Sequence, residues 1–124
     1  MRAMHLWRKR VKDLRYVAEM LERRQQSQKK RHGRSARLHR LADRADTLAE
    51  VLGEDHDLAV LAARVHAEAK SGKHARKKSK RIGRTTRKAL LKQIARRRRK
   101  LRRRALREGE HLYRRSPKKF VRQL

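Results

Sequence analysis

Between Glu68 and Glu108 the chain carries 20 Lys and Arg residues and no acidic residue. Like charges at that density repel one another, so this stretch packs compactly only if anions or acidic neighbours offset its charge. Residues 43–68 supply part of that compensation, because they hold seven acidic and two basic residues. Over its 124 residues the protein nevertheless keeps a formal net charge of +29. The sequence therefore predicts a fold built around an acidic middle segment and a protein that binds anions.

Composition narrows the class of protein further. Leu, Ile, Val and Phe together number only 24 residues, so composition alone leans towards disorder unless the apolar residues follow a regular period. The absence of Cys excludes disulfides, Fe–S ligation and thiol nucleophiles, and it fits a reducing, cytoplasmic location. The longest apolar run, residues 58–63, is far too short to cross a bilayer, and we expect no membrane partner.

The apolar residues do follow a period, with steps of three and four residues that are typical of amphipathic helices. The stripes cover residues 4–21, 38–52, 58–69 and 91–112, and Ser116-Pro117 is expected to stop the last one. No run of β-branched residues has the alternation of a strand. The sequence therefore predicts an all-α fold, a four-helix bundle that forms a single domain over residues 1–124.

Local signals suggest where these helices begin and end. Gly53 is expected to end the second helix and Asp55 to cap the third. Residues 70–84 combine Gly, Ser and many basic residues and are expected to form a basic loop. Thr85 or Thr86 is expected to open the last helix.

A row of cationic side chains borders the first apolar stripe. His5, Arg8, Lys12 and Arg15 share its 3-4-3 spacing one residue later along the chain, and Lys9 lies beside them. Such a row suits an extended polyanion, because Arg makes forked contacts to phosphate oxygens and Lys supplies a mobile charge. On pattern alone, a solvated helix flank is an equally good interpretation.

Two further groups of polar residues stand out. Arg98 and Glu108 fall on the inner stripe of the last helix, so they are either paired at the bundle edge or placed for a ligand. Asp55 is expected to cap a helix and to pair with a neighbouring one. His56 and Asp57 are expected to reach the cationic row and orient its side chains.

Three blocks of sequence resemble the CHAD domain, a conserved histidine α-helical domain. They are residues 5–16 (HLWRKRVKDLRY), residues 52–61 (LGEDHDLAVL) and residues 109–120 (GEHLYRRSPKKF), which holds the blocks GEHLY and SPKKF. The family's order and spacing match over nearly the whole chain, but only for the second of its two four-helix repeats.

The resemblance implies a binding function. CHAD domains bind inorganic polyphosphate around a basic pore, and many accompany a CYTH-type triphosphatase or sit on polyphosphate granules. It implies polyphosphate contacts at His5, Arg8, Lys12, Arg15 and Lys9. Arg98 and Arg102 are expected to form the facing wall of a groove between the first and last helices. The missing first repeat implies that a second polypeptide or a second copy of this chain completes the pore.

Sequence features also bear on three other functions. Binding of RNA or DNA is the main alternative, because +29 attracts any nucleic acid, although the four aromatic residues are too few for extensive base stacking. A metal site is not expected, since Glu108 and His111 form a single Glu-x-x-His pair without its second half. No hydrolase signature is present, so neither catalysis nor a cofactor is expected.

Overall fold

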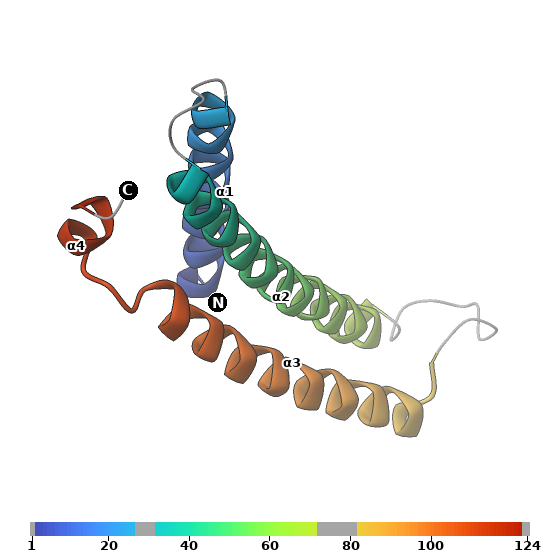
Figure 1. The fold of residues 1–124 in the computed structure, drawn as a ribbon. Coiled ribbons are helices and arrows are strands. Elements are labelled where there is room, and N and C mark those ends of the chain that lie inside the picture. Colours follow the sequence, from blue (N-terminus) through green and yellow to red (C-terminus); the bar gives the residue numbers. More distant parts are fainter. Residues whose placement is uncertain (1, 27–31, 72–81, 123–124) are drawn as a thin grey trace.

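The computed structural model describes residues 2–26, 32–71 and 82–122, and within these ranges it is helical without strands. The helices are α1 (Arg2–Gln26), α2 (His32–Ser71), α3 (Arg84–Leu112) and the short α4 (Pro117–Arg122) (Figure 1). The predicted all-α class is confirmed. The described residues form four helices, but two of the predicted helices are joined in α2 and the fourth helix is the short α4. Three of these helices are long, and their boundaries differ from the prediction.

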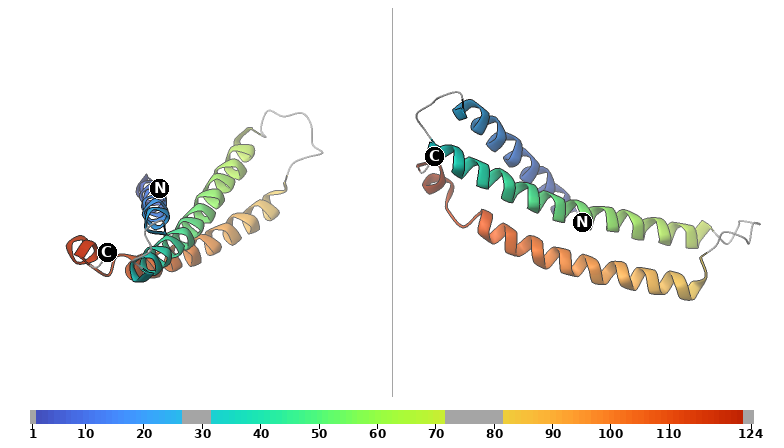
Figure 2. Two further views of the ribbon diagram at one scale, coloured as in Figure 1. Left: turned by 45° about the horizontal axis from the view of Figure 1, so that its top comes forward. Right: turned by 45° about the vertical axis from the view of Figure 1, so that its right-hand side comes forward.

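Helix α2 is the central element, and α1 and α3 each run antiparallel along it (Figures 1 and 2). Contacts between α1 and α2 progress from His5–His56 through Arg15–Asp46 to Glu22–His39, which fixes the register of this pair. Helix α1 therefore covers only the first part of α2. The second part packs against α3 alone, so Val60 and Leu61 are exposed although Leu61 lies on a predicted apolar stripe.

The core lies where all three long helices meet. It is made from small and branched apolar side chains, with Met4, Trp7, Leu58 and Leu112 packed at its margin, and its buried members are Val11, Ala45, Leu48, Ala49, Val51, Leu52, Leu101 and Ala105. Small side chains on α2 let α1 approach closely. Trp7 is the side chain that links α1 to α3, since its ring packs on Gly109.

The predicted break between the second and third helices does not occur, because residues 32–71 form one continuous helix of 40 residues. Gly53 lies inside this helix and is buried, and no described residue has a positive φ angle. The lack of a side chain at Gly53 makes room for the Arg8 guanidinium rather than for a left-handed turn. Asp55 does not cap a helix, and its buried carboxylate faces α3 instead.

Substituting Gly53 tests this continuity. A Cβ atom at Gly53 would lie 3.5 Å from Nη2 of Arg8, an ordinary van der Waals distance. Ala is favoured over Gly inside a helix, so we expect Gly53→Ala to raise the free energy of unfolding by about 0.5–1 kcal/mol. Urea unfolding followed by circular dichroism measures the change. A loss of stability would instead indicate the helix end that the sequence predicted.

The boundaries of α3 and α4 also differ from the prediction. Helix α3 begins at Arg84, with Gly83 in the N-cap position and without a side-chain cap, so neither threonine opens it. It ends at Leu112, before Ser116. Ser116 instead starts α4, where its hydroxyl accepts a hydrogen bond from the backbone N–H of Lys119 (3.4 Å), and Pro117 takes the first helical position. Most of the predicted loop 70–84 lies outside the described residues.

Candidate functional site

The cationic row of α1 lies along the seam between α1 and α2. The guanidinium of Arg8 rests over Gly53, with Nε 3.6 Å from the position of a Cβ atom there. This Nε is buried and has no hydrogen-bond acceptor among the described residues. A buried N–H without an acceptor is costly, and a charged oxygen from a bound anion would satisfy it.

Two histidines from different helices meet beside Arg8. The rings of His5 on α1 and His56 on α2 have centroids 5.7 Å apart and planes tilted by 40°. His56 thus adjoins the row through its contact with His5. Asp57 is exposed and makes no ion pair with the row in the described structure, so its expected orienting role stays a prediction.

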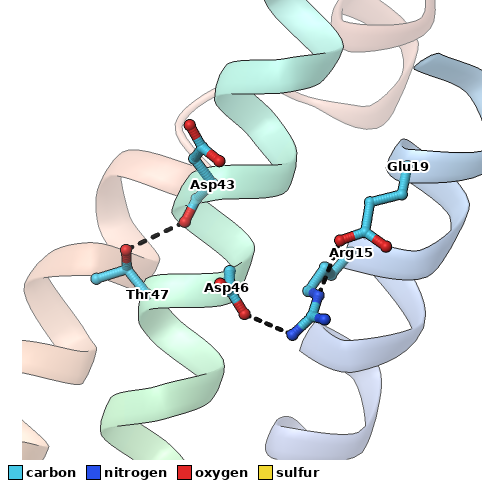
Figure 3. Close-up of polar contacts among 5 residues, drawn as sticks. All are labelled: Arg15, Glu19, Asp43, Asp46 and Thr47. Atoms are coloured by element: carbon cyan, nitrogen blue, oxygen red, sulfur yellow. Dashed lines mark hydrogen bonds and ion pairs between the residues drawn. The ribbon is translucent and has the colours of Figure 1, made fainter. Parts of the chain in front are cut away.

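Arg15 differs from the rest of the row because two carboxylates hold it (Figure 3). Its Nε lies 3.0 Å from Oε1 of Glu19, and its Nη1 donates a short hydrogen bond to Oδ1 of Asp46 on α2. The guanidinium also lies over the ring of Tyr16, 5.3 Å from its centroid. The hydrogen bond to Glu19 is the main cause that raises the pKa of Arg15, and the charge of Asp46 adds to it. Arg15 therefore helps to hold α1 on α2, and its charge is largely compensated.

Lys9 and Lys12 complete the row. Lys9 is exposed and Lys12 is half-buried, and neither has an ion pair with another described residue. The charge that remains available along this seam therefore comes from Arg8, Lys12 and Lys9, with His5 at its start. From His5 to Lys12 the row extends for about 10 Å along α1, at 1.5 Å per residue.

Arg98 and Arg102 lie in a different environment, on α3 next to Asp55. The Nε of Arg98 is 2.9 Å from Oδ1 of Asp55, and that of Arg102 is 3.6 Å from the same oxygen. Asp55 is only 4% exposed. Arg98 is thus paired across the α2–α3 interface, which is the first of the two roles expected for it.

The two sets of cations do not face each other across one groove. The row contacts α2 at Gly53, while Arg98 and Arg102 contact it at Asp55. Residues two positions apart on a helix point about 160° away from each other, so these contacts lie on opposite sides of α2. The predicted groove between the first and last helices is therefore divided into two seams, one on each side of α2.

A third cationic cluster was missed by the sequence analysis. A half-open cavity of about 420 Å³ lies between the first part of α2, the end of α3 and Phe120 of α4. Five arginines and a histidine line it, namely Arg37, Arg40, Arg44, His111, Arg114 and Arg115. The signal for half of it was present, because Arg37, Arg40 and Arg44 repeat the 3-4 spacing used to find the row on α1. The other half comes from residues 111–115, which only the folded chain brings to the same place.

Within the described part of the chain, no three metal-ligating side chains gather at one point. None of its helices has an apolar stretch long enough to cross a bilayer. Comparisons with protein-family models, curated proteins and solved structures gave no match. The resemblance to the CHAD domain therefore stays a prediction.

Proposed function

We propose that the protein binds inorganic polyphosphate along the seam between α1 and α2. The observation that carries the proposal is Arg8, whose buried Nε has no hydrogen-bond acceptor in the described structure while Lys12 and His5 lie on the same edge of α1. If the guanidinium turns outward from Gly53, a phosphate oxygen would satisfy the Arg8 Nε and place neighbouring phosphates beside Lys12 and Lys9. The resemblance to the CHAD domain supports the same ligand.

The mechanism is electrostatic capture by a partly prearranged seam. The ligand would gain one directional contact at Arg8 and mobile contacts at the lysines, while counterions are released from the polyanion, so affinity should fall steeply with salt. Arg15 would act indirectly, since its ion pairs with Asp46 and Glu19 hold α1 in register on α2. Arg98 and Arg102 are assigned by this proposal to holding α3 on Asp55, with no direct phosphate contact. This function needs no catalytic group.

Binding of RNA or DNA is the competing function. The aromatic side chains argue against a protein that recognises nucleic acids by stacking their bases. The Trp7 ring is used in packing on Gly109, and the guanidinium of Arg15 lies over one face of Tyr16. Tyr16 and Tyr113 are each about half exposed, and two such rings offer few faces on which bases could stack. A ligand made of phosphates alone matches this surface better than one that also offers bases.

The test compares two double variants of α1 that remove the same charge. Arg8→Ala with Lys12→Ala removes two cations of the seam, whereas Arg10→Ala with Arg24→Ala removes two exposed cations from another face of the same helix. At fixed salt, we expect the seam variant to bind long-chain polyphosphate at least about tenfold more weakly than the control variant, because a hydrogen bond to a charged group contributes about 1.5–3 kcal/mol. Titration of a fluorescent polyphosphate, with helicity checked by circular dichroism, measures it.

Equal losses in the two variants would contradict the proposal, since they would indicate attraction by diffuse charge. Competition provides a second criterion. RNA that displaces polyphosphate at equal phosphate concentration would favour the nucleic-acid function instead.

A further inference from the structure

The cavity of about 420 Å³ at the α2–α3–α4 end has the size of a small-molecule site. The α2–α3 register, set by Glu54–Arg97 and Asp55–Arg98, brings residues 40–44 of α2 opposite the end of α3. The segment from Tyr113 to Ser116 then leads to α4 (Figure 1), whose Phe120 also lines the cavity. The cavity thus has walls from two segments that are about 70 residues apart in sequence.

The charge of this cavity is of one sign. Its lining includes five arginines and His111 and no carboxylate. Gathering guanidinium groups from two distant segments costs repulsion, which a bound anion would offset. Arginine presents a planar fork that pairs with two phosphate oxygens at once, so several arginines around one small space suit adjacent phosphates.

The remaining lining is apolar and comes from Leu41, Leu112 and Phe120. An apolar surface next to charged donors suits an organic anion, because its organic part can pack on the apolar side chains while its charged group meets the donors. Phe120 is also the residue by which α4 meets the rest of the cavity, and α4 buries none of its own residues.

We propose that this cavity binds a small molecule that carries a di- or triphosphate group. The phosphates lie among Arg40, Arg44 and Arg114, and an organic ring, where the ligand has one, rests on the apolar wall. The site uses none of the residues of the α1–α2 seam, so it stands independently of polyphosphate binding there. Because α4 is otherwise held by few contacts, the bound ligand also ties α4 to α2.

Calorimetric titration with ATP and with inorganic tripolyphosphate tests the site. Arg40→Ala with Arg44→Ala removes two arginines of the cavity from α2, and Arg64→Ala with Lys70→Ala removes two exposed cations from the same helix outside the cavity. We expect the first pair to weaken binding of both probes at least about tenfold relative to the second pair. Arg114→Ala, which lies outside any helix, should weaken both probes in the same direction.

Equal losses from the two double variants, or no binding of either probe to the unaltered protein, would overturn the proposal. Phe120→Ala identifies the source of the phosphate group. If only the affinity for ATP falls, the ligand is a nucleotide; if the affinity for both probes is unchanged, the ligand is a free oligophosphate. Either result is consistent with a site for phosphate groups.

Arg8→Ala with Lys12→Ala should leave ATP affinity within about threefold of that of the unaltered protein, because loss of a distant charge pair is screened at ordinary salt. Failure of the seam and failure of the cavity are therefore distinguishable.

Discussion

Replacing Asp55 by Asn is expected to destabilise the protein by about 3 kcal/mol, a large share of the stability of a small domain. Asp55 is 4% exposed and is the shared partner of Arg98 and Arg102. The side chain of Arg98 is itself only 18% exposed. Asn has nearly the same shape as Asp but no charge, so the substitution leaves the Arg98 guanidinium partly enclosed without its counterion.

The neighbouring residue provides a matched control. Glu54 pairs with Arg97 one position earlier on both helices, but their side chains are 46% and 53% exposed. Exposed ion pairs contribute little, so Glu54→Gln is expected to cost less than about 1 kcal/mol. Both substitutions raise the net charge by one, and urea unfolding at the same salt compares them directly. Similar losses would mean that the Asp55 carboxylate is solvated rather than enclosed.

Gly109→Ala is expected to destabilise the protein by about 1–3 kcal/mol, although Ala is normally the better residue inside a helix. A Cβ atom at Gly109 would lie 2.8 Å from Cζ2 and 3.2 Å from Cη2 of Trp7. These atoms belong to the six-membered ring of the indole, which has little freedom to move because it packs at the margin of the core. The new methyl group would therefore push α1 away from α3.

A double-mutant cycle separates this clash from other effects. Trp7→Phe removes the outer ring, so Gly109→Ala in that background should be neutral or stabilising. We expect a coupling energy of at least about 1 kcal/mol between the two sites, measured by thermal or urea unfolding. The same loss from Gly109→Ala in both backgrounds would show that Trp7 does not contact Gly109.

Periodicity was sufficient to predict the class of fold, because each long helix carries an apolar stripe with steps of three and four. The predicted break between two helices at Gly53 was wrong because tertiary contacts decide the structure there. Gly and Asp are local signals for the end of one helix and the start of the next, but here Arg8 occupies the space over Gly53 and Arg98 pairs with Asp55. Packing on both sides of α2 outweighs the local preference.

The same limit applies to the candidate sites. The 3-4-3 spacing placed the row of α1 beside its packing face, and the structure puts it there. Spacing could not indicate that Arg15 would be paired with Asp46, because that contact joins residues 31 positions apart. The cavity lined by five arginines could not be predicted from the sequence either. Its two halves are separate segments that only the antiparallel pairing of α2 and α3 brings together.

The unequal coverage of α2 has a consequence for how the molecule opens. This helix is about 60 Å long at 1.5 Å per residue, yet α1 packs only along its N-terminal part (Figure 2). Beyond residue 58 it meets a single neighbour, and Val60 and Leu61 face water there. Thermal fraying should therefore start at the far end of the α2–α3 hairpin and travel towards the three-way junction, leaving the proposed α1–α2 binding seam in the last part to melt.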